Sequence, residues 1–119
     1  MRQYQTGLTG EDQAERYLTQ QGMSCVARRF RAEGGEIDLI MLEGDMVVMV
    51  EVKYRPTGMR GDGLRAVTPL KRRRMCRAAL AFLVEREWMS RPVRFDVVEI
   101  TAGGILHVPN AFLAGDYGG

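Results

Sequence analysis

Two acidic residues and a lysine, Asp38, Glu51 and Lys53, interrupt segments that are otherwise largely apolar. Asp38 lies in the run EIDLIML, and the other two lie in MVVMVEVKY. Carboxylates of this kind can hold a divalent metal ion, which polarises a phosphate group and lowers the pKa of a bound water. A lysine beside them can orient that water or stabilise the charge that develops on phosphorus. These residue types therefore indicate metal-assisted hydrolysis of a phosphodiester bond.

The two runs around these residues have the pattern of a β-hairpin. Both are rich in Ile and Val, and the tripeptide EGD between them is a turn signal. Side chains alternate along a strand, so Glu51 and Lys53 point to the same face. A two-residue loop at Gly44-Asp45 would place Asp38 directly across from Glu51. The same loop would place Glu36 across from Lys53. A three-residue loop without a bulge would instead put the two acids on opposite faces.

A structural salt bridge is the alternative interpretation of these residues, with Lys53 paired to Glu51 or to Asp38. A buried ion pair rarely stabilises a protein more than well-packed apolar side chains would. Two opposed carboxylates about 5 Å apart at Cβ also repel each other unless a cation lies between them. We therefore favour a metal site. Because His107 is the single histidine, oxygen ligands are expected, and these suit Mg²⁺ or Mn²⁺.

Glu11 is a further acidic candidate, on a helix predicted ahead of the hairpin. Thr9 is a plausible N-cap, and the helix is expected to continue to about Gln21. On such a helix Glu11 shares the inward-facing stripe of Ala14 and Leu18. The alternative is that a glutamate in a first turn simply complements the helix dipole.

A basic cluster follows the glycine-rich loop that is predicted over residues 56–67. Thr68-Pro69 predicts the start of a helix that continues to about Trp88. Cations in the first turns of a helix oppose its dipole, so a phosphate backbone is a reason for their presence, and a solvated cationic face is the alternative. The predicted nucleic-acid-binding residues are Arg55, Lys71, Arg72, Arg73, Arg74 and Arg77. Arg60 and Arg65 in the loop are candidates to extend this surface.

The remaining strands are predicted at Met23–Arg31, Val93–Ile100 and Ile105–Val108. The element order is then helix, three strands, helix, two strands. The second helix is long enough to be the crossover of a mixed sheet. A length of 119 residues, with 45% hydrophobic and 27% charged residues, predicts a single globular domain over residues 1–119.

The cysteine content and the hydropathy pattern bear on the compartment. No apolar run is long enough to span a bilayer, and the first residues lack the apolar core of a secretion signal. The two cysteines, Cys25 and Cys76, do not have the spacing of a metal site. A reduced cytoplasmic location is therefore expected.

The arrangement of Asp38, Glu51 and Lys53 resembles the PD-(D/E)xK signature of restriction-endonuclease-like nucleases, with Ile37 in place of the proline. More specifically, the chain resembles the YraN family of small bacterial proteins, which are predicted endonucleases related to archaeal Holliday junction resolvases. The matching segments are GEDQAERYL, GGEIDLI, VEVKYR, the helix from Lys71 to Leu83, RFDVV and NAF. Together they span most of the chain.

This resemblance implies an α/β (α+β) fold with a restriction-endonuclease-like αβββαβ core, in which helices flank a mixed central sheet. It implies Mg²⁺ (or Mn²⁺) bound by Asp38 and Glu51, with Glu11 as a further acidic ligand and Lys53 as the catalytic lysine. It also implies a DNA substrate, with branched DNA as a candidate, and a homodimer. A non-catalytic nucleic-acid-binding module is the alternative. A protein-interaction scaffold, in which the acids form an ion-pair network, is the third hypothesis.

Overall fold

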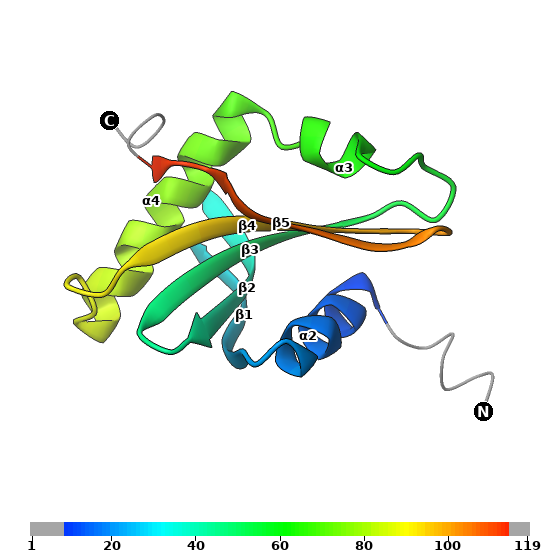
Figure 1. The fold of residues 1–119 in the computed structure, drawn as a ribbon. Helices are drawn as coiled ribbons and strands as arrows, with labels where there is room; N and C mark the ends of the chain where they lie inside the picture. The colour runs from blue at the N-terminus through cyan, green and yellow to red at the C-terminus, as the bar shows by residue number, and fades with distance from the viewer. Residues whose placement is uncertain (1–8, 115–119) are drawn as a thin grey trace.

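Helices cover both faces of one five-stranded sheet in the computed structural model, which describes residues 9–114 apart from the side chain of Arg65 (Figure 1). In chain order the elements are α2 (Gly10–Gln20), β1 (Ser24–Ala32), β2 (Gly35–Glu43), β3 (Met46–Tyr54), α3 (Asp62–Arg65), α4 (Pro69–Arg86), β4 (Val93–Thr101) and β5 (Gly104–Phe112). This mixed α+β fold confirms the predicted fold class. The short helix α3 is an addition within the predicted glycine-rich loop.

The sheet is mixed, and its strands lie in the order β1-β2-β3-β4-β5. Strands β1, β2 and β3 are antiparallel to their neighbours within that set, and β4 and β5 are antiparallel to each other. Strands β3 and β4 are parallel, and the connection between them contains α3 and α4. A parallel pair needs such a long crossover, as the sequence predicted. The arrangement is compatible with an αβββαβ core.

The β2–β3 hairpin closes with the predicted two-residue loop. Glu43 pairs with Met46, which leaves Gly44 and Asp45 as the loop. Gly44 has a φ of +61°, whereas Asp45 keeps a negative φ. A positive φ at only the first of two loop residues matches a type II′ turn, whose first position favours glycine.

The hairpin ladder ends one residue before the predicted pair of acids. Its last pair is Leu39 with Val50, so Asp38 and Glu51 are not partners in the ladder. Instead, Asp38 Oδ2 accepts a hydrogen bond of 2.7 Å from the backbone N–H of Val52. The Asp38 side chain thus accepts a hydrogen bond from a backbone N–H group of β3.

Glu36 is also placed differently from the prediction. Its carboxylate lies on the β1 side of β2, where Oε2 is 3.2 Å from Arg31 Nε. Arg31 is also the residue that pairs with Glu36 in the β1–β2 ladder. The predicted pairing of Glu36 with Lys53 was wrong because the β2–β3 ladder stops before it reaches them.

Two apolar clusters cover the two faces of the sheet. Helix α4 packs on one face and α2 on the other (Figure 1). On β3, Val47 and Met49 face α4, whereas Val48 and Val50 face α2. Because side chains alternate along a strand, Glu51 continues the row that faces α4.

Gly35 lets α4 approach the start of β2 closely. A Cβ added at this position would lie 2.1 Å from the carbonyl oxygen of Arg74. Real Cβ atoms do not come so close, so only glycine fits without a shift of the helix. The contact holds the first turns of α4 directly over the sheet.

The ends of two elements differ from the predicted ends. Helix α4 ends at Arg86 rather than near Trp88, because Glu87 adopts a left-handed conformation with a φ of 59°. Strand β5 continues to Phe112, beyond the predicted end at Val108. None of the helices within residues 9–114 is long and apolar enough to cross a membrane.

Candidate active site

Asp38, Glu51 and Lys53 converge at one end of the β2–β3 hairpin, as the sequence predicted. Lys53 Nζ lies 3.2 Å from Glu51 Oε2. The carboxyl group of Asp38 lies beside that of Glu51, and the Val52 N–H holds it in place. The side chain of Glu51 is only 3% exposed and that of Lys53 is 16% exposed. Two acids and a lysine therefore share a partly desolvated site.

A second lysine, Lys71 of α4, also reaches this site. Its Nζ lies 2.6 Å from the same Oε2 atom of Glu51. Thr68 caps the helix by accepting a hydrogen bond of 3.2 Å from the Lys71 N–H, which fixes the first turn. The sequence predicted a DNA contact for Lys71, but not its contact with Glu51. Which side chain of the first turn faces β3 depends on how the helix is rotated against the sheet.

Burial and the charges of this site shift the pKa values of its members. Burial, with a smaller contribution from the charge of Glu51, raises the pKa of Asp38 to about 7. Burial also lowers the pKa of Lys53, although Glu51 opposes the shift. For Lys71 burial acts in the same downward direction, but the hydrogen bond and charge of Glu51 outweigh it and raise the pKa. Near neutral pH, Asp38 is therefore poised between its protonated and ionised forms.

The donor set of Asp38 and Glu51 fits a magnesium ion. Within residues 9–114 there is no group of three or more His, Cys, Asp or Glu side chains that could hold a metal. Mg²⁺ does not need such a group, because it commonly binds one or two carboxylates and keeps water or phosphate oxygens at its other positions. The raised pKa of Asp38 is consistent with this fit, since a cation between the two acids would relieve their repulsion.

Glu11 lies on α2, which covers the opposite face of the sheet. Ala14 and Leu18 are buried in the apolar cluster of that face, as predicted. The Oε1 atom of Glu11 is 2.7 Å from Arg29 Nε and 3.7 Å from Arg28 Nη2. Its charge adds slightly to the raised pKa of Asp38. The structure does not bring Glu11 into the group around Glu51, so its role as a metal ligand stays a prediction.

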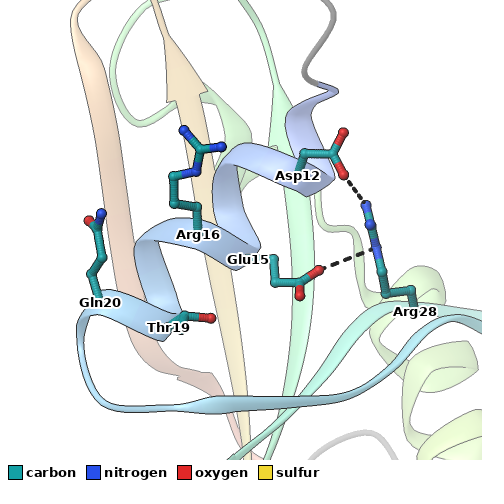
Figure 2. Close-up of a pocket in the computed structure, with 6 residues that line it drawn as sticks. All are labelled: Asp12, Glu15, Arg16, Thr19, Gln20 and Arg28. Carbon is teal, nitrogen blue, oxygen red and sulfur yellow. Dashed lines mark ion pairs between the residues drawn. The ribbon is translucent and has the colours of Figure 1, made fainter. Parts of the chain in front are cut away.

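A surface depression of about 520 Å³ lies along α2. It is lined by Asp12, Glu15, Arg16, Thr19, Gln20 and Arg28 (Figure 2). Arg28 lies between two acids, with Nη2 2.9 Å from Asp12 and Nε 3.6 Å from Glu15 (Figure 2). The two acids of this depression, Asp12 and Glu15, both point toward Arg28 and not toward each other. The depression therefore lacks the close pair of carboxyl groups found at Asp38 and Glu51.

The predicted nucleic-acid-binding arginines fall into two groups. Arg72 turns inward: its Nε donates a hydrogen bond of 2.8 Å to the Val67 carbonyl, and its guanidinium lies 5.2 Å from the ring centroid of Phe112. The exposed group consists of Arg55, Arg60, Arg73, Arg74 and Arg77. The side chain of Arg65 lies outside the described residues. Exposed cations therefore flank the site, whereas Arg72 turns inward, and the role of these arginines in DNA binding stays a prediction.

Glu99 is a buried acid that the sequence analysis did not select. It pairs with Lys53 in the parallel β3–β4 ladder and is 2% exposed. Its carboxylate accepts hydrogen bonds from the backbone N–H groups of Gly61, at 2.7 Å, and of Gly63. A Cβ at Gly63 would lie 2.9 Å from both Glu99 Oε2 and Lys53 Cβ. Glu99 thus holds the glycine-rich loop against Lys53. Its interruption of an apolar strand, as at Glu51, was the available signal.

Asp96 is a buried aspartate on β4, the strand next to β3. Arg94 donates to both of its oxygens, at 2.8 and 3.0 Å. His107 Nε2 lies 2.7 Å from Oδ2, and the Asn110 N–H donates at 2.9 Å. Burial acts to raise the pKa of Asp96, but these hydrogen bonds together lower it. The carboxylate is fully surrounded by donors from β4 and β5.

Comparisons with known proteins place the chain among relatives of similar length. Residues 10–100 match the model of a family described as "Uncharacterised protein family UPF0102". A UPF0102 protein of Herminiimonas arsenicoxydans is 45% identical over 105 residues, which cover 88% of this chain and 84% of the relative. One of Klebsiella pneumoniae is 43% identical over 110 residues, covering 91% and 86%. One of Geobacter metallireducens is 41% identical over 110 residues, covering 89% and 90%. None of these descriptions names an activity.

Proposed function

We propose that this chain, which belongs to the uncharacterised family UPF0102, also called the YraN family, is a metal-dependent endonuclease that hydrolyses DNA phosphodiester bonds. One observation carries the proposal: Asp38, Glu51 and Lys53 meet in a partly desolvated site whose two carboxyl groups contact each other. A purely structural ion pair would not bring a second acid against the first, because buried like charges are costly.

Each residue of the site has a role in this proposal. Asp38 and Glu51 would hold Mg²⁺ or Mn²⁺, which commonly binds one or two protein carboxylates and keeps other oxygen ligands. When bound, the cation polarises the phosphate and lowers the pKa of a coordinated water. Lys53, already 3.2 Å from Glu51, orients the attacking water or stabilises the charge that develops on phosphorus.

The exposed arginines beside the site fit the backbone of DNA. Arg73, Arg74 and Arg77 lie on the first half of α4, and Arg55 directly follows β3. Such cations bind phosphates without regard to base sequence. This supports DNA as the substrate class. We include branched DNA and a homodimer in the proposal because of the resemblance to resolvases, which act on paired strands.

Cleavage assays with Asp38→Asn test the proposal. Labelled four-way, nicked and linear DNA are incubated with Mn²⁺ or Mg²⁺ and with native or variant protein. Loss of a metal ligand should remove several kcal/mol of transition-state stabilisation, so cleavage should fall by roughly a thousandfold. Asp45→Asn is the matched control, because Asp45 is an exposed aspartate in the turn of the same hairpin. Equal cleavage by the native protein and Asp38→Asn would contradict the proposal.

A non-catalytic nucleic-acid-binding module is the second candidate function. The contact of Lys71 with Glu51 favours it, because a protein ammonium there already neutralises the carboxylate. The module predicts DNA binding without metal-dependent cleavage. If about four phosphates are contacted, the logarithm of the affinity should fall with the logarithm of the salt concentration at a slope of about −3.6.

A further inference from the structure

We propose that Lys71 occupies the cation position at Glu51 until a divalent metal displaces it, and that the released ammonium then contacts the phosphate of bound DNA. The inference rests on the proposed nuclease function. It assigns Lys71 two successive partners within one site. It also makes Lys71 a determinant of metal affinity, beyond its predicted contact with the DNA backbone.

The geometry around one oxygen atom carries the inference. Glu51 Oε2 lies 2.6 Å from Lys71 Nζ and 3.2 Å from Lys53 Nζ. These two ammonium groups already crowd the atom that a metal would need. A divalent cation on Glu51 would repel both of them, because like charges a few ångströms apart interact strongly in a partly desolvated site. At least one lysine must therefore move when the metal binds.

Lys71 is better placed to move than Lys53. The side chain of Lys71 is 40% exposed, whereas that of Lys53 is 16% exposed. Lys53 is also enclosed by the glycine-rich loop, because a Cβ at Gly63 would lie 2.9 Å from Lys53 Cβ. The Lys71 ammonium lies at the end of a flexible four-carbon stem, and it can leave Glu51 by rotating that stem. The helix itself need not move.

The first turns of α4 determine where the ammonium goes. Thr68 and the close contact at Gly35 fix the backbone of these turns over the sheet. Arg73 and Arg74 are exposed on the same turns. A phosphate drawn to these arginines and coordinated to the metal would lie within the region that the Lys71 side chain can sweep. The lysine thus exchanges a carboxylate partner for a phosphate partner.

Calorimetric titration with Mn²⁺ tests the displacement without DNA. Lys71→Met should bind Mn²⁺ roughly tenfold more tightly than the native protein, because no charge-assisted hydrogen bond has to be broken first. Arg73→Met is the matched control, because it removes the same charge two residues away and lacks the contact with Glu51. Its affinity should stay within about twofold of the native value. Equal affinities of Lys71→Met and Arg73→Met would overturn the inference.

A second measurement separates this inference from the proposed function. With saturating Mn²⁺, Lys71→Met should cleave DNA more slowly than native protein although it binds the metal more tightly, and Lys71→Arg should recover part of the rate. If native protein binds Mn²⁺ and cleaves DNA but Lys71→Met behaves like Arg73→Met, only the displacement is overturned. If none of the proteins binds Mn²⁺, both proposals fail. Lys71→Gln serves as the second uncharged variant if Lys71→Met does not fold.

Discussion

Two buried or half-buried aspartates on the same sheet have opposite electrostatic surroundings. Asp96 accepts hydrogen bonds from Arg94, His107 and the Asn110 N–H, and its pKa is lowered. Asp38 has one backbone donor and a neighbouring carboxyl group, and its pKa is raised to about 7. The residue type is the same, but one carboxylate is neutralised by the protein and the other is not. This difference is what the proposed metal site predicts for Asp38, whose charge the protein does not neutralise.

The acids of this sheet are therefore of two kinds, those that stabilise the fold and those whose charge the fold leaves unbalanced. Acids with a shifted pKa and no cationic partner are typical of functional sites, whereas acids that accept hydrogen bonds from several donors stabilise structure. Glu99 belongs with Asp96, because two backbone N–H groups satisfy its carboxylate. Glu51 belongs with Asp38, because the cations beside its Oε2 atom are lysine side chains, and one of them, Lys71, is 40% exposed. Four acids of one small sheet thus divide into two pairs.

Asp96→Ala should have the largest effect on stability. It leaves Arg94 without its main partner, and breaking a largely buried pair costs about 3–5 kcal/mol of unfolding free energy. Asp38→Ala should cost much less, because it also removes the repulsion with Glu51. Urea denaturation of both variants at pH 8 measures the difference. Similar losses in the two variants would mean that the two aspartates do not differ as we infer.

The pH dependence of stability should have opposite signs for the two aspartates. Asp38 has a folded-state pKa of about 7 and an ordinary value of 3.8, so between these values the folded state keeps a proton that the unfolded chain has released. The unfolding free energy should therefore fall, by up to a few kcal/mol, as the pH rises from about 4 to about 7. Asp38→Asn should remove this fall.

Asp96 should instead affect the pH dependence of stability at acidic pH. Its pKa is lowered from 3.8, so its stabilisation is complete above that value and is lost as the pH falls through the folded-state pKa. Asp96→Asn should therefore reduce the acid-induced loss of stability and leave the change between pH 4 and pH 7 in place. Denaturation curves across this pH range, in chelator, distinguish the two contributions. Identical pH profiles of the two variants would contradict the comparison.

Glu99→Gln should have a smaller and local effect. The glutamine side chain has a single acceptor oxygen and its NH2 group can only donate, so one of the two N–H groups of Gly61 and Gly63 loses its acceptor. That amide should exchange with solvent roughly tenfold faster. Amides of α2, such as that of Leu18, serve as the internal control. Unchanged exchange at both glycines would show that Glu99 does not hold the loop.

The smallest expected effect is a change in the salt dependence of DNA binding, which should differ between the exposed Arg73 and the inward-facing Arg72. Arg73→Gln should reduce the salt slope of DNA binding by about 0.9, because one phosphate contact is lost. Arg72→Gln should leave the slope nearly unchanged and lower the stability instead, because Arg72 contacts Val67 and Phe112. Equal changes in the salt slope for Arg72→Gln and Arg73→Gln would mean that both arginines contact the DNA.

Local patterns were sufficient to predict most of the elements and the central triad. The turn at Gly44 and the alternation of the two strands determine which face Asp38, Glu51 and Lys53 occupy, and both can be recognised in the sequence. The contacts of Lys71 and Glu99 could not be predicted in this way. They depend on how α4 is rotated over the sheet and on how the glycine-rich loop folds back, and both follow from packing between distant segments.

The departure at Asp38 has a similar cause. Strand periodicity places it opposite Glu51, but periodicity does not reveal where a ladder ends. The ladder ends because the Asp38 side chain accepts the Val52 N–H. That side-chain bond competes with regular pairing, as short acidic side chains often do near the ends of elements.

Gly35 carries no functional group, yet the assembly of the candidate site depends on it. The contact of Gly35 with the Arg74 carbonyl brings α4, and with it Lys71, within reach of Glu51. A replacement as small as Gly35→Ala would lift the start of the helix while every acid and lysine remained in the sequence. Such a protein would pass any screen of genomes that scores these chains by their charged residues. A survey for family members that can assemble this site should therefore include this glycine among its criteria.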